Sequence, residues 1–87
     1  MDNVDFSTKD LYLSAALLSL GASLINIDRT DPKHMEFQFV SDSSLDLKSI
    51  ELEWTNKTLE CNAASFAEAI RRMKALVHSR QSSDTHY

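Results

Sequence analysis

The stretch Ser23–Val40, SLINIDRTDPKHMEFQFV, decides the fold of this chain. Two runs that alternate apolar and polar residues flank its centre. Ile25 and Ile27 are the apolar members of the first run, and Phe37 and Phe39 belong to the second. Because successive side chains of a strand point to opposite faces, this pattern predicts a β-hairpin with one apolar face and one polar face.

Apolar residues at helical spacing predict a helix before the hairpin, over residues 8–20. Ser7 or Thr8 is expected to cap its N-terminus, where a side-chain oxygen can accept hydrogen bonds from free amides. Gly21 is the only glycine of the chain, follows the last periodic leucine and suits a left-handed C-cap. Apolar residues surround nearly the whole helix, which is typical of either a deeply buried helix or a dimer interface, so a homodimer is an open alternative.

Two more helices and a third strand are predicted after the hairpin. Asp31–Pro32 favours the hairpin turn itself. Residues 45–54, with a cap at 42–44, combine helical spacing with an alternating second half, and we favour the helix over the strand. Residues 58–61 are the candidate third strand. Asn62 is expected to cap a last helix over 63–79, whose apolar stripe consists of Phe66, Ala69, Ile70, Met73, Leu76 and Val77.

The predicted fold is a small two-layer α+β domain in the order α-β-β-α-β-α. Its three-stranded, mainly antiparallel sheet is expected to carry the helices on its apolar face. One domain spans residues 7–79, and residues 1–6 and 80–87 are expected to be flexible ends. Tyr12, Trp54 and Phe66 lie on apolar stripes and are expected in the core.

The composition favours a cytoplasmic protein that does not bind nucleic acid in general. The formal net charge of the 87 residues is −4, and the acidic residues are concentrated in residues 1–62. Such an acidic body is poorly suited to neutralising phosphates. Cys61 has no second cysteine to pair with, which favours a reducing compartment. No segment has the pattern of a signal peptide or a membrane span.

Two motifs resemble those of a known family. They are Thr-Lys-Asp-Leu-Tyr at residues 8–12 and Phe-Ala-Glu-Ala-Ile-Arg-Arg-Met-Lys at residues 66–74. The chain resembles, over about residues 7–78, a family of short bacterial and phage proteins classed as a domain of unknown function. The resemblance supports a helix before the third strand, and it implies no activity and no functional residue. Members of the family often have glycine where Lys57 stands, so the resemblance implies a more open turn there.

Catalytic and metal-binding patterns are missing from the sequence. His34, His78 and His86 are far apart along the chain, and Cys61 is expected to face inward from the third strand. No phosphate-binding loop, nucleophile motif or zinc spacing is present. We therefore expect neither an enzyme, nor a metal site, nor a cofactor.

The polar side of the predicted sheet is the first candidate binding surface. If the third strand joins the hairpin, this side carries Asn26, Asp28, Glu36, Gln38, Thr58 and Glu60. Carboxylates on an open face can attract a basic partner protein, and the alternative interpretation is an ordinary solvated sheet face. The candidate protein-binding residues are Asp28, Glu36, Gln38 and Glu60.

The basic edge of the last helix is the second candidate. Arg71, Lys74 and His78 follow one another at helical spacing, with Arg72 beside them. Such a ridge could follow a phosphate backbone, although cations near a helix C-terminus are also favoured by the helix dipole. We expect a non-enzymatic module that binds another protein, an accessory of phage or mobile-element origin on the basis of the resemblance. Weak nucleic-acid binding through the last helix is the alternative.

Overall fold

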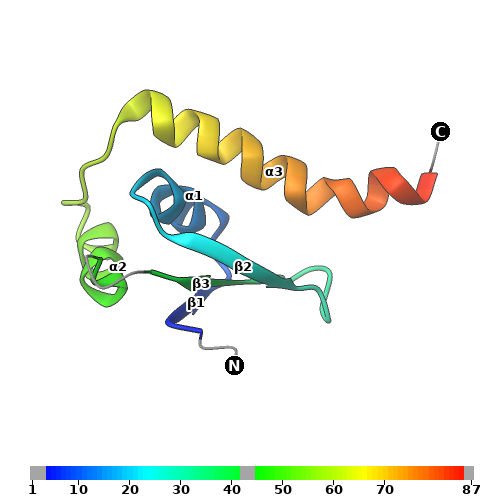
Figure 1. Cartoon of the computed structure of the whole chain (residues 1–87), viewed down its shortest axis with the longest axis horizontal. Helices are drawn as coiled ribbons and strands as arrows, with labels where there is room; N and C mark the ends of the chain where they lie inside the picture. Colours follow the sequence, from blue (N-terminus) through cyan, green and yellow to red (C-terminus); the bar gives the residue numbers. More distant parts are fainter. Residues whose placement is uncertain (1–3, 42–44, 86–87) are drawn as a thin grey trace.

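The computed structural model describes residues 4–41 and 45–85, and it confirms a small α+β domain with a three-stranded antiparallel sheet. α1 lies across one face of the sheet, α3 lies on the far side of α1, and α2 lies beside the end of the sheet (Figure 1). The elements, in chain order, are β1 (Phe6–Thr8), α1 (Leu11–Ser19), β2 (Ser23–Asp28), β3 (Glu36–Val40), α2 (Leu47–Thr55) and α3 (Ala63–Thr85).

The predicted hairpin is confirmed as β2 and β3. β3 is the central strand and pairs antiparallel with β1 on one side and β2 on the other. The turn is closed at Asp31, whose backbone carbonyl accepts a hydrogen bond from the amide of His34 at 2.9 Å. The side chain of Asp31 accepts a second bond from the amide of Lys33 at 3.0 Å. Aspartate at the first position of a turn stabilises it in this way.

The third strand does not come from residues 58–61, and that prediction is wrong. β1 pairs with β3 instead, with Phe6 opposite Phe39. Phe6 is only 6% exposed, so it belongs to the core and not to an N-terminal lead. β1 occupies the edge of β3 that β2 leaves free. The amide of Thr58 donates instead to the carbonyl of Glu53 at the end of α2, and residues 58–62 connect α2 to α3.

A β-bulge in β2 changes which of its residues face the helices. Leu24 pairs with Phe39 and Asn26 pairs with Gln38, so the register shifts between these two pairs. Leu24 therefore contributes to the core, whereas Ile25 is 44% exposed. The prediction that Ile25 shares the apolar face is wrong, because one extra residue in a strand reverses the alternation beyond it.

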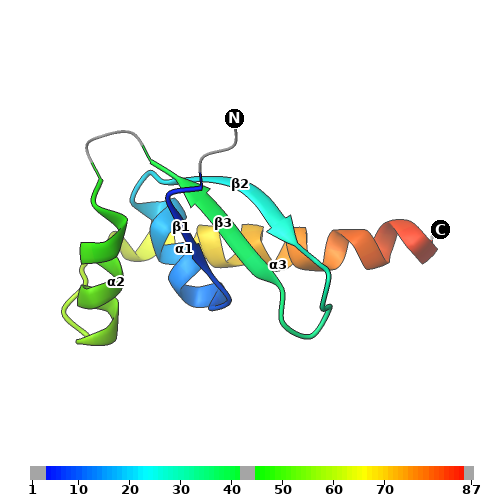
Figure 2. The same cartoon turned by 90° about the horizontal axis from the view of Figure 1, so that it is seen from below.

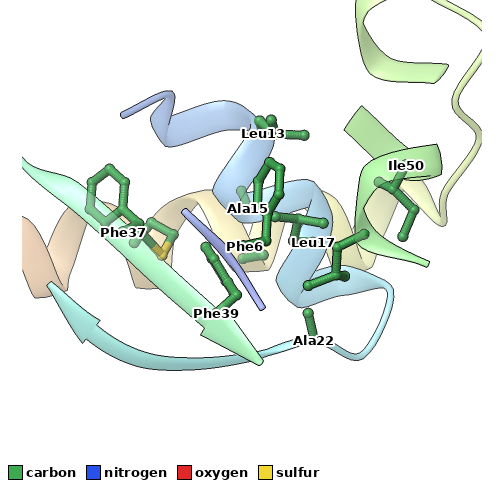
Figure 3. Close-up of a cluster of buried hydrophobic side chains, with 11 residues drawn as sticks. Phe6, Leu13, Ala15, Leu17, Ala22, Phe37, Phe39 and Ile50 are labelled. Atoms are coloured by element: carbon green, nitrogen blue, oxygen red, sulfur yellow. The ribbon is translucent and has the colours of Figure 1, made fainter. Parts of the chain in front are cut away.

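The core lies between the sheet and α3, with α1 passing through it (Figure 3). Leu17 of α1, Phe39 of β3 and Met73 of α3 have no exposed surface. All residues from Leu13 to Leu17 are buried. The broad apolar surface of α1 is thus covered within one chain, and it supplies no argument for a homodimer.

The aromatic residues expected in the core divide into two groups. Trp54 and Phe66 are half-buried, and their ring centroids lie 6.4 Å apart at the junction of α2 and α3. Tyr12 is 47% exposed, so its prediction as a core residue is wrong. It lies at the N-terminal end of α1, where its ring faces the ammonium group of Lys74 at 5.9 Å from the centroid.

Aspartate and asparagine side chains cap the helix N-termini. Asp10 caps α1, in place of Ser7 or Thr8, and accepts from the amides of Tyr12 and Leu13 at 2.9 and 3.1 Å. Asp46 caps α2, and the cap predicted at 42–44 lies outside the described residues. The predicted cap of α3 is confirmed, since Asn62 accepts from the amide of Ser65 at 2.9 Å. α3 itself continues beyond its predicted end to Thr85.

α1 and α2 end in the same hydrogen-bond pattern. The amide of Gly21 donates to the carbonyl of Leu18, and the amide of Ala22 donates to the carbonyl of Leu17, which is a Schellman motif. Gly21 has a φ of 108°, as the predicted left-handed cap requires. The equivalent position after α2 is Lys57, with a φ of 63° and its amide bonded to the carbonyl of Trp54. The turn at Lys57 is therefore tight, and the expectation of a more open turn is wrong.

Candidate protein-binding face

The face of the sheet that points away from α1 and α3 is not covered by any described helix (Figure 2). We call it the open face. Cross-strand register places on it the polar residues Ser7, Asn26, Asp28, Glu36 and Gln38. Sheets of this kind have one face packed on the core and one face in water, so the open face is available to a partner.

The centre of the open face is neutral and hydrogen-bonded. The side-chain amide of Asn26 donates to the side-chain carbonyl of Gln38 at 3.2 Å, across β2 and β3. Ser7 pairs with Gln38 from the other side, so one polar row crosses all three strands. Such cross-strand pairs hold neighbouring side chains in fixed positions.

The turn end of the open face carries two carboxylates in direct opposition. Asp28 and Glu36 are cross-strand partners, and like charges in such a pair destabilise a sheet. Hydrogen bonds from the side chain and the amide of Thr30 hold the pKa of Asp28 below its ordinary value of 3.8, and the positive charge of Lys9 adds a smaller effect. Asp28 is therefore ionised at neutral pH. The opposed pair places two acidic side chains at the turn end of the uncovered face, and hydrogen bonds from Thr30 hold that of Asp28.

Three of the four residues predicted for protein binding lie together on the open face, namely Asp28, Glu36 and Gln38. Glu60 does not join them. It is exposed in the connection between α2 and α3, because the strand predicted to carry it does not form. Sequence reasoning missed Ser7, which β1 brings to the face. The short alternation of β1 was the only sequence signal for this placement, and Ser7 was interpreted as a helix cap.

The basic residues predicted for nucleic-acid binding all lie on α3, and all are exposed: Arg71, Arg72, Lys74 and His78. Two of them have neighbours that reduce their availability to phosphate. Lys74 lies over the ring of Tyr12. Arg72 lines a shallow hollow between α1 and α3 that also contains Glu68. A carboxylate beside a cation weakens the attraction of an anionic backbone.

The candidate catalytic and metal-binding residues do not converge. His34 is exposed in the hairpin turn, and His78 is exposed on α3. Cys61 is half-buried in the α2–α3 connection and not in a strand, and His86 lies outside the described residues. Within residues 4–41 and 45–85, no three histidine, cysteine or acidic side chains are placed to hold a metal ion. No helix in this part of the chain has the length and apolar character to cross a membrane.

The fold and the open face define a small α+β domain with an uncovered polar sheet surface. A family model described as "Domain of unknown function (DUF5659)" matches residues 3–79. The chain belongs to this family. The match includes β1, α1, the hairpin, α2 and the greater part of α3. No curated protein and no solved structure matches the chain.

Proposed function

We propose that this chain is a small, non-enzymatic protein-binding module whose open face receives a basic surface of another protein. The observation that carries the proposal is the direct opposition of Asp28 and Glu36 on an uncovered sheet. Like charges on directly opposed residues of a sheet repel each other. A partner that supplies a lysine or arginine between them would remove this repulsion.

The middle of the open face supports the same use. Asn26 and Gln38 present amide groups that both donate and accept hydrogen bonds. A partner could therefore be oriented by the neutral amide row and attracted by the carboxylate pair. Electrostatic attraction of this kind raises the association rate and weakens as salt increases.

The cellular setting is part of the proposal. The single Cys61 favours a reducing, cytoplasmic environment. The role of an accessory protein in a phage or mobile element rests on the sequence resemblance described above.

Affinity capture from the native host tests the proposal. The bait variant is Asp28→Asn combined with Glu36→Lys, because asparagine can still accept the hydrogen bond from Thr30 while removing the charge. The matched control is Glu60→Lys, which also reverses an exposed carboxylate but lies off the open face. We expect a partner that the wild type and the control retain and the double variant loses.

The proposal fails if the double variant retains every partner of the wild type. It also fails if only nucleic acid co-purifies, in a form that nuclease treatment removes. The second result would favour the exposed basic edge of α3. In that case Arg71→Glu combined with His78→Glu should abolish retention.

A further inference from the structure

A second concave surface lies on the helix side of the hairpin turn. It is a hollow of about 230 Å³ where the β1–α1 junction, the turn and α3 meet. Its apolar floor is formed by Leu11, Met35, Phe37 and Val77. We call it the hairpin hollow. Ligand sites typically combine such an apolar floor with a few polar groups at the rim.

The rim of the hairpin hollow is basic. Lys9, Lys33 and His34 line it and are exposed, and no carboxylate is among its described lining residues. The turn also brings two acidic groups close to this rim, and both accept hydrogen bonds from amides of the turn. Asp31 accepts a hydrogen bond from the amide of Lys33, and Asp28 accepts one from the amide of Thr30.

Arg29 fixes the wall of the hollow. Its guanidinium donates to the carbonyl oxygens of Leu76 and Val77 on α3 at 2.9 and 3.4 Å. The same group contacts the sulfur of Met35 at 3.8 Å. These contacts join the hairpin to α3, so the floor exists before a ligand arrives. A preformed site avoids the entropic cost of ordering its walls on binding.

We propose that the hairpin hollow binds an acidic linear peptide of a partner protein. The peptide places one apolar side chain on the floor and its carboxylates against Lys9, Lys33 and His34. Charge complementarity selects an acidic ligand, and the volume admits one or two side chains. A nucleic acid fits less well, because Phe37 is 3% exposed and offers no ring face for a base to stack on. The hairpin hollow is a different surface from the open face, and it favours an acidic ligand where the open face favours a basic one.

The test is an NMR titration of the full chain with a blocked hexapeptide, Asp-Glu-Leu-Phe-Glu-Asp. One control peptide replaces the acidic residues by lysine, and another replaces the two apolar residues by serine. We expect amide shifts confined to residues 9–11 and 33–37 with the first peptide and none with the controls. Binding should weaken at least about tenfold in Lys9→Glu/Lys33→Glu and when salt rises from about 50 to about 500 mM.

The matched control variant is Lys48→Glu/Lys57→Glu, which reverses two exposed lysines outside the hollow. It should bind the acidic peptide like the wild type. Asp28→Asn/Glu36→Lys should also bind it, which separates this proposal from that of the open face. The proposal is overturned if the acidic peptide causes no shifts at the hollow or if the Lys9/Lys33 variant binds equally well. Preferential binding of decanoate or of a short oligonucleotide would overturn it as well.

Discussion

The left-handed backbone at Lys57 predicts that Lys57→Gly stabilises the domain. Lys57 follows the C-cap of α2 and has a φ of 63°, a conformation in which the Cβ atom crowds the neighbouring carbonyl. The backbone is held there by two hydrogen bonds. The amide of Lys57 donates to the carbonyl of Trp54 at 3.1 Å, and that of Thr58 donates to the carbonyl of Glu53 at 2.9 Å. The chain itself supplies the comparison, because Gly21 fills the equivalent position after α1.

The magnitude follows from two opposing terms. An L-residue in the left-handed region costs about 1–2 kcal/mol relative to glycine. Glycine in turn loses more conformational entropy on folding, which offsets about 0.5–1 kcal/mol. Lys57→Gly should therefore raise the free energy of unfolding by about 0.5–1 kcal/mol. For a domain of this size, that corresponds to an increase in Tm of about 2–8 °C.

Thermal unfolding followed by circular dichroism measures the effect, with urea unfolding at constant temperature as a second assay. Lys57→Ala is the matched control, because it removes the charge and the long side chain but keeps the Cβ atom. It should change stability by less than about 0.5 kcal/mol. A decrease in Tm for Lys57→Gly would refute the reasoning. An equal increase for both variants would also refute it, because the gain would then come from losing the lysine and not from relieving the backbone.

Four further predictions concern the core, the caps and the contact between the hairpin and α3. Gly21→Ala should destabilise the domain by about 1–2 kcal/mol in urea unfolding, although a Cβ atom there would meet only the Leu45 side chain, at 3.9 Å. Met73→Ala should cost about 2–4 kcal/mol in the same assay, because Met73 has no exposed surface and lies in the core cluster. Arg29→Met should speed hydrogen exchange of the α3 amides near residues 76–78, since the bonds to the α3 carbonyls are lost. Hydrogen bonds from Ser49 lower the pKa of Asp46, as those from Thr30 lower that of Asp28. A carboxyl whose pKa is lowered in the folded state stabilises the fold above its ordinary pKa of 3.8. This contribution is lost as the pH falls through the pKa that the group has in the folded state. Between about pH 6 and about pH 3, the free energy of unfolding of the Asp28→Asn/Asp46→Asn variant, measured in urea, should therefore fall less than that of the wild type.

The elements that could be predicted from the sequence are those fixed by local chemistry. The hairpin turn follows from Asp31, and the end of α1 follows from Gly21, since each residue acts on backbone within a few positions of itself. The stripe of α3 was predictable because an apolar period of 3.6 residues, sustained over several turns, is specific to a helix. The ambiguous segment 45–54 is helical as α2, with Leu47 and Ile50 buried.

The failures share a different cause, which is competition between distant segments. β1 has three residues, too few for a recognisable alternation, and it is a strand because β3 offers it an edge. Residues 58–61 have a similar local pattern, but that edge is already occupied and the amide of Thr58 is used at the end of α2. Likewise, a search for strict alternation cannot detect the β-bulge at Ile25. The predicted placement on one sheet face was therefore right for Asp28, Glu36 and Gln38 and wrong for Glu60.

The open face stays uncovered because α3 packs against α1 and not against that side of the sheet. Met73 and Ala69 of α3 are buried, and α3 packs against α1. The outer positions of the sheet hold Ser7, Asn26 and Gln38, with Val40 at one end, and offer little apolar surface to a helix. Both helices consequently lie on the same side, and the polar side contributes little to the core. The core thus depends on one face of the sheet, and the proposed binding surface is the other face. The Asp28→Asn/Glu36→Lys variant removes the repulsion between the opposed carboxylates and keeps the acceptor for the Thr30 amide, so it should not be less stable than the wild type at neutral pH. A lost partner in this variant would then report on recognition and not on folding.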